Sequence, residues 1–461
     1  MKTRREHLET VRRELIDLER TAASGSAALR VWAAPLQIED IQSRIPADAA
    51  LIEFVEYQDF DPTRILSDHA SKAVLVGAFV LRSAGDPRWV PLGEAAAINA
   101  SARVFREVLV DSEVPPKKLR ERARDLYDRL AAPLEFHLEG VRTVLVAPDR
   151  ALVLVPFGAL VDPDGRYWVE RYEFSYLTSG RDLLLSNSAP TSGGSPLVVA
   201  APAYDAKRPA ERPAVWPART RLSPEIAALH FPPIELSQTG ASDVGKLLGV
   251  TPLTGVRASD TAIRSAHAPR VLHIASDGFF LPDQNRKSTL RWGSILNVQS
   301  GLRSRILESP LLRTGLAFAG VNNRGSNTDD GLLIAQEIAN LDLWGTQLVA
   351  IEVRGIEKAQ AAVHQSVYAL RRSLVIAGAE SQFVNLWTTD HRAATKLTNA
   401  YYERLLAGVG RVEALRSVQL EMLRSEAHSH PFYWASFVSI GARGPIAWAS
   451  SPADPGNSGS P

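Results

Sequence analysis

Cysteine is missing from this 461-residue chain. Its absence excludes disulfides, a cysteine-based zinc site and a thiol nucleophile. The histidines do not compensate, because His428 and His430 are two residues apart, and His267 and His273 are six apart. Neither pair has the i, i+4 spacing of a zinc-binding helix. The sequence therefore predicts no metal site and no cofactor.

An excess of charge of either sign is also lacking. The 52 basic and 51 acidic residues leave a formal net charge of +1, so bulk electrostatics predict neither a nucleic-acid nor a membrane-surface partner. The longest apolar runs, such as residues 151–161, are too short to span a bilayer. Residues 1–20 are too charged to contain a signal-peptide core. These absences together favour a soluble, cytoplasmic protein.

Changes in composition predict five segments. Residues 1–34 are expected to form a helical segment that lies on the body of the protein or docks a partner. Residues 187–221 are rich in Pro, Ser and Gly around one apolar strand, 197–201, which is typical of a linker. The linker separates an N-terminal α/β lobe, 35–186, from a C-terminal lobe, 222–448. Residues 449–461 are expected to be a disordered tail.

The C-terminal lobe alternates between apolar strand patterns and helix patterns. The expected strands are 271–275, 348–352, 383–387 and 435–440, and the expected helices are 331–339, 361–377, 392–406 and 412–425. This alternation predicts a mostly parallel sheet with helices on both faces. The N-terminal lobe is expected to contain strands at 50–57, 72–81, 143–147 and 151–155, a helical stretch at 116–138, and a strand-pair region at 167–177.

Reactive groups in such sheets lie on loops just past the carboxyl ends of the strands. Ser276-Asp277-Gly278 follows one expected strand and Val353-Arg354-Gly355 follows the next along the chain. These two tripeptides are therefore the candidate site before any family is considered.

Several ordered segments resemble the CHAT domain, a bacterial relative of caspases and separases. The segments are Leu272-His273-Ile274-Ala275-Ser276-Asp277-Gly278-Phe279-Phe280, Leu343-Trp344-Gly345-Thr346, Val367-Tyr368-Ala369-Leu370-Arg371-Arg372 and His430-Pro431-Phe432-Tyr433-Trp434. The resemblance extends from about residue 35 to about residue 446. It implies an α/β, caspase-haemoglobinase-like three-layer sandwich and, in active members, a cysteine endopeptidase.

The resemblance implies that Asp277 occupies the position of the family's catalytic histidine and that Arg354 occupies the position of its catalytic cysteine. Aspartate is too weakly basic for the histidine's role at neutral pH, and arginine stays protonated. The sequence thus predicts a pseudopeptidase with a regulatory or protein- and peptide-binding role. We hypothesise that Asp277 and Arg354 form a salt bridge across the former active site; in the alternative, each side chain extends separately into solvent.

Other residues complete the candidate site. Gly278, Glu352, Gly355, Asp330 and His364 are expected at the rim of the cleft. Ser276 is the fallback nucleophile of a second hypothesis, a hydrolase that does not use cysteine. His273 lies on an apolar strand and is expected to be a satisfied core residue. A third alternative is a scaffold whose remaining task is to fold with a partner.

Overall fold

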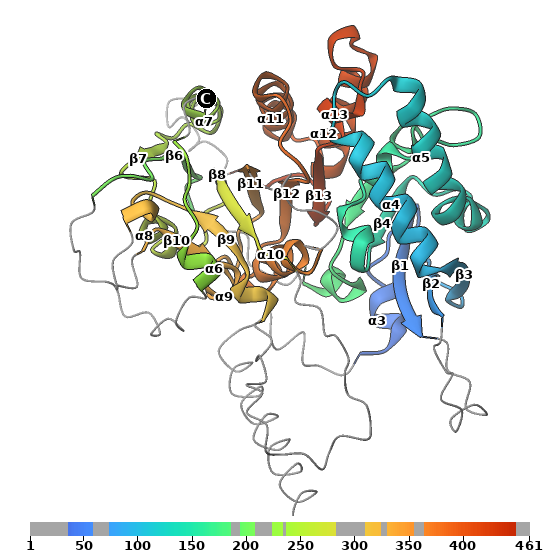
Figure 1. The fold of residues 1–461 in the computed structure, drawn as a ribbon. Helices are drawn as coiled ribbons and strands as arrows, with labels where there is room; N and C mark the ends of the chain where they lie inside the picture. Colours follow the sequence, from blue (N-terminus) through green and yellow to red (C-terminus); the bar gives the residue numbers. More distant parts are fainter. Residues whose placement is uncertain are drawn as a thin grey trace, which may run out of the picture.

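The computed structural model describes residues 36–58, 73–185, 194–207, 224–233, 237–282, 309–323, 330–354 and 364–448 (Figure 1). The predicted N-terminal helical segment, the predicted tail and Gly355 lie outside the described residues.

One mixed sheet runs through both predicted lobes. In spatial order it contains β10 (Leu332–Ile334), β9 (Thr314–Ala317), β8 (Val271–Phe280), β11 (Leu348–Arg354), β12 (Ser381–Asn385), β13 (Phe437–Gly441), β5 (Glu173–Tyr176), β4 (Thr143–Ala147), β1 (Ala49–Gln58), β2 (Val74–Leu81) and β3 (Arg88–Glu94). The pairing of Ile440 in β13 with Tyr176 in β5 joins the two halves. The described part of the chain is therefore α/β, as the sequence predicted.

The centre of the sheet is parallel. The strand predicted inside the linker is β6 (Leu197–Pro202), which pairs in parallel with β8 and with β7 (Leu253–Gly255). β8 also pairs in parallel with β11, and β11 with β12. The first four residues of β11, Leu348–Ile351, are all buried, which explains why such a strand appears in the sequence as a nearly continuous apolar run.

Helices cover both faces of this sheet. Phe383 in β12 stacks on Tyr401, with ring centroids 4.3 Å apart, whereas the amide of the preceding Gln382 donates to the Arg371 carbonyl at 2.9 Å. Tyr401 belongs to α11 (His391–Leu406) and Arg371 to α10 (His364–Ala377). Because successive strand residues point to opposite faces, α10 and α11 lie on opposite sides of the sheet (Figure 1). This arrangement is the predicted three-layer sandwich.

The described part of the chain contains further α-helices. The α-helices are α3 (Ile38–Gln42), α4 (Ala95–Leu109), α5 (Pro116–Leu130), α6 (Pro224–Ala227), α7 (Ser237–Leu248), α8 (Asp260–Arg264), α9 (Ala335–Ile338), α12 (Arg411–Arg424) and α13 (Pro431–Trp434). α7 packs on β6 and against α11, so it belongs to the α11 layer.

Three predicted elements differ in the structure. Residues 150–154 form a 3-10 helix instead of a strand, because a short buried apolar run does not by itself distinguish the two. Residues 332–334 form β10 before the short helix α9 begins. The helical stretch at 116–138 changes at Ala132 from α5 to a 3-10 helix, where Pro133 lacks the N–H that an α-helix needs.

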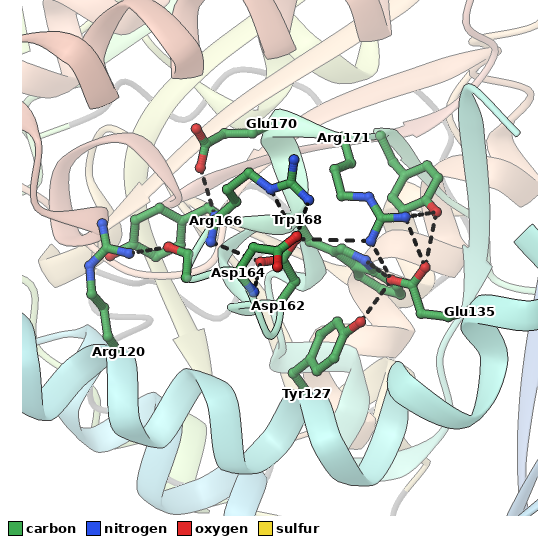
Figure 2. A network of polar contacts seen from close by, with 12 residues as sticks. Arg120, Tyr127, Glu135, Asp162, Asp164, Arg166, Trp168, Glu170 and Arg171 are labelled. Atoms are coloured by element: carbon green, nitrogen blue, oxygen red, sulfur yellow. Dashed lines mark hydrogen bonds and ion pairs between the residues drawn. The ribbon is translucent and has the colours of Figure 1, made fainter.

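A polar network explains why residues 167–177 are not a strand pair (Figure 2). The carboxylate of Glu135 accepts hydrogen bonds from the Trp168 indole at 2.9 Å, the Tyr127 hydroxyl at 2.8 Å and both terminal nitrogens of Arg171 at 3.0 Å. These contacts hold residues 168–170 in a 3-10 turn, so that only Glu173–Tyr176 pairs as β5.

Candidate functional site

The two positions that the resemblance predicts for the dyad, Asp277 and Arg354, face each other across one strand pair. β8 and β11 are parallel, and their register places Arg354 directly opposite Asp277. Both residues lie in the strands and not in loops, which corrects the prediction for 276–278 and 353–354. β8 continues to Phe280 because Gly278, Phe279 and Phe280 pair with β9, a contact distant in sequence.

Asp277 and Arg354 form the ion pair hypothesised from the sequence. Arg354 donates from Nε to Asp277 Oδ1 at 2.7 Å and from Nη2 to Oδ2 at 3.0 Å. The Asp277 side chain is 9% exposed and that of Arg354 is 41% exposed. The pair is bidentate, a geometry that makes charge-assisted hydrogen bonds strong, and one side of the guanidinium is open to solvent.

A cavity of about 250 Å³ lies beside this pair, between the sheet and the helices α7 and α11. Its floor comes from β8 and β11, including His273, Ala275, Glu352 and Arg354. These side chains share a face because strand residues two apart point the same way. The walls include Ala241, Val244, Trp387, Thr389, Ala394, Thr395, Thr398, Asn399 and Phe437.

Two titratable groups line the cavity floor. The Glu352 carboxylate accepts a 2.6 Å hydrogen bond from the Thr398 hydroxyl, yet burial raises its pKa to about 7. His273 lies 3.1 Å from the Tyr402 hydroxyl through Nδ1. Burial lowers the pKa of this imidazole to about 4, so His273 is neutral at pH 7. His273 is the satisfied core histidine that the sequence predicted.

Ser276 has different surroundings from those of a nucleophile. The side chain is 2% exposed, and its hydroxyl donates to the Ala317 carbonyl. The Tyr204 hydroxyl lies 3.2 Å from the Ser276 hydroxyl and accepts the Asp277 N–H at 2.8 Å. Among the described residues, no imidazole hydrogen-bonds to Ser276, so the chain gives it no general base there.

The predicted rim residues separate into two groups. Gly278 stands next to the ion pair, where an added Cβ would lie 2.5 Å from Val353 Cγ1, and Glu352 lies on the cavity floor. Asp330 is buried in the turn before β10, where it accepts the Leu332 N–H. His364 opens α10 and lines a different cavity with Arg150 and Tyr368. The structure thus does not bring Asp330 and His364 to the cavity beside the ion pair.

Sequence reasoning missed the contribution of α11. Thr395 and Asn399 are four residues apart, as are Ala394 and Thr398, and all four line the cavity. The i, i+4 spacing places each pair on neighbouring turns of one helical face. A polar stripe within an otherwise packed helix was the available signal.

The fold is an α/β sandwich, and its candidate site is an ion pair at the carboxyl ends of the parallel strands β8 and β11. The site contains no thiol. The model of the CHAT domain family matches residues 120–442. The chain therefore belongs to the CHAT domain family. Because it contains no cysteine, it lacks any cysteine-based catalytic dyad.

Curated relatives include tetratricopeptide repeat protein 28 from Homo sapiens, 25% identical over 335 residues, and its counterpart from Mus musculus, 26% identical over 356 residues. Each match covers 69% of this chain and 13% of the relative. The chain thus spans about an eighth of the length of these proteins.

Solved structures that resemble the fold include the Saccharomyces cerevisiae separase–securin complex, with a TM-score of 0.43, 8% identity, and coverage of 88% of this chain and 30% of that chain. Gingipain R has a TM-score of 0.36, 8% identity, and coverage of 76% and 74%. Within the described ranges, no helix combines the length and apolar character needed to cross a membrane.

Proposed function

We propose that this CHAT domain binds a peptide segment of a partner protein at the ends of β8 and β11 without cleaving it. The observation that carries the proposal is the cavity that opens beside the Asp277–Arg354 pair. A peptide held there has one side chain in the cavity and its backbone along the strand ends. In this proposal the chain itself has a regulatory role.

The size and lining of the cavity support a single side chain as its occupant. Small-molecule sites usually enclose about 300–1,000 Å³, and this cavity, at about 250 Å³, is smaller. Val244, Trp387 and Phe437 supply apolar wall area, while Glu352 supplies a carboxylate at the floor. A long side chain with an apolar stem and a cationic end matches both features.

The chemistry of the site supports binding without turnover. An attacking thiolate is excluded by composition, the guanidinium of Arg354 does not deprotonate, and the Ser276 hydroxyl is directed to a backbone carbonyl. No feature of the described residues favours the alternative of a non-cysteine hydrolase.

The experiment is a binding screen of the full chain against an immobilised peptide array. Thr395→Trp places an indole at the cavity wall, and Lys396→Trp adds the same group at a neighbouring exposed position of α11. We expect at least a tenfold loss of binding in the first variant and little change in the second. Equal binding by both variants would mean that the cavity is not the binding site.

Cleavage is tested separately with Asp277→His combined with Arg354→Cys. The introduced thiol would be the chain's sole thiol, so its alkylation by iodoacetamide reports on it alone. We expect mass spectrometry of a peptide library to show cleavage only by the doubly substituted protein. Cleavage by the wild type would contradict the proposed function and revive the hydrolase hypothesis.

A further inference from the structure

We infer that the ligand is the carboxyl terminus of a peptide whose last residue is lysine or arginine. In this arrangement the terminal carboxylate binds Arg354 and the cationic side chain reaches Glu352. The inference rests on the proposed peptide-binding function and specifies which part of a peptide is bound.

The guanidinium of Arg354 has one edge in use and one edge open. Nε and Nη2 donate to the two oxygens of Asp277. Nη1 and the second hydrogen of Nη2 make no hydrogen bond within the described part of the chain, and the side chain is 41% exposed. An arginine has five donors in a fixed planar fork, so its open edge can bind a second carboxylate in the same bidentate manner.

Glu352 supplies the opposite charge on the same face of β11. It precedes Arg354 by two residues in β11 and lies on the same face, at the cavity floor. The Cα atoms of Glu352 and Arg354 are separated by two strand residues, about 6.6 Å, and a lysine carries its ammonium group on a flexible four-carbon stem. A terminal lysine can therefore place its carboxylate at Arg354 while its ammonium group meets Glu352.

The charge of Arg354 favours a chain end over a continuous chain. An internal peptide bond offers Arg354 a neutral carbonyl, whereas a carboxyl terminus offers two charged oxygens, and charge-assisted bonds are about twice as strong as neutral ones. The family's cysteine would stand where Arg354 stands. The residue at this position is thus suited to the carboxylate that a cleavage leaves behind, and not to the carbonyl that a nucleophile attacks.

The partial neutralisation of the site supports a doubly charged ligand. Asp277 occupies one edge of the Arg354 guanidinium and leaves the other edge to a second anion. His273 is neutral at pH 7, and Glu352 carries a negative charge when ionised. A terminal lysine adds one positive and one negative group, so each meets an opposite charge. A peptide amide ending in lysine leaves the open edge of Arg354 with no anion.

The test uses fluorescence anisotropy with the full chain and pools of fluorescein-labelled pentapeptides that are randomised at the first four positions. One pool ends in lysine with a free carboxylate, a second ends in lysine amide, and a third ends in norleucine with a free carboxylate. We expect the first pool to bind at least tenfold more tightly than either of the others. Arg354→Gln should abolish the preference for acid over amide, and Glu352→Gln the preference for lysine over norleucine.

The outcomes distinguish this inference from the proposed function. Equal affinity for acid and amide pools in the wild type would overturn the inference while peptide binding stands. An absence of binding to all three pools would overturn both. Free L-lysine serves as a competitor, because it carries the same two groups. If it competes as effectively as the acid pool, the ligand is an amino acid and the assignment to a peptide terminus is wrong.

Discussion

The Asp277–Arg354 pair should contribute to stability asymmetrically. Arg354→Gln leaves the Asp277 carboxylate with a 9% exposed side chain and without its two guanidinium donors. Asp277→Asn instead leaves an arginine that is 41% exposed and hydrated. We therefore expect the loss of the arginine to cost more than the loss of the aspartate.

The magnitudes follow from the exposure of each partner. Removing one partner of a fully buried pair costs about 3–5 kcal/mol, and exposed pairs contribute about 0–1 kcal/mol. Because water reaches the guanidinium, we expect Arg354→Gln to cost about 1–2 kcal/mol and Asp277→Asn about 0.5 kcal/mol. The double variant should cost less than the two single changes combined, with a coupling energy of about 1 kcal/mol.

The assay is urea unfolding followed by tryptophan fluorescence for the wild type, both single variants and the double variant. Repeating it in 1 M NaCl should reduce the coupling, since salt screens a partly exposed pair. Two results would refute the reasoning: a coupling energy below about 0.3 kcal/mol, or a larger cost for Asp277→Asn than for Arg354→Gln.

The other predictions concern protonation and packing. Burial raises the folded-state pKa of Glu352 from 4.5 to about 7, so its stabilising contribution is full below pH 4.5 and is lost as the pH rises through 7. The Tm of Glu352→Gln minus that of the wild type should therefore be larger at pH 8.5 than at pH 5. A difference in Tm that does not change with pH would contradict this. The folded-state pKa of His273 is lowered from 6.5 to about 4, so wild-type stability falls from pH 6.5 to 4, and His273→Phe should lessen that fall in urea unfolding measured at both pH values. A Cβ at Gly77 would overlap the ring of Trp89, a side chain that is 41% exposed and can shift, so Gly77→Ala should cost about 1 kcal/mol and alter tryptophan fluorescence. Gly444→Ala, which meets nothing within 4 Å, should do neither.

The sequence was most informative about buried strands and about the ion pair between Asp277 and Arg354. Apolar runs located the first residues of β8 and β11, because strands buried on both faces need such runs. The predicted strand 383–387 overlaps β12, in which Phe383 and Val384 are the apolar residues. The positions of Asp277 and Arg354 came from ordered motifs, and their direct opposition follows from the parallel register of β8 and β11.

Contacts distant in sequence account for what the sequence did not predict. β6 belongs to the sheet because it pairs with β8, although its flanks have the composition of a linker. The turn at residues 168–170 depends on Glu135, more than thirty residues earlier. No local pattern in either segment specifies its distant partner, so propensity alone gives the wrong element or the wrong place.

The cavity shows how a local rule and a distant contact combine to form a site. Strand alternation alone places Glu352 and Arg354 on one face of β11, and this much follows from the sequence. That this face is lined by α7 and α11, instead of α10, depends on packing between helices more than a hundred residues apart. Glu352 consequently lies in a cavity beside Thr398, while the side chain of the intervening Val353 is buried in the hydrophobic core. The same alternation explains why a charged residue at 352 is tolerated in a buried strand: its side chain points to a cavity, where the Thr398 hydroxyl donates a hydrogen bond to it.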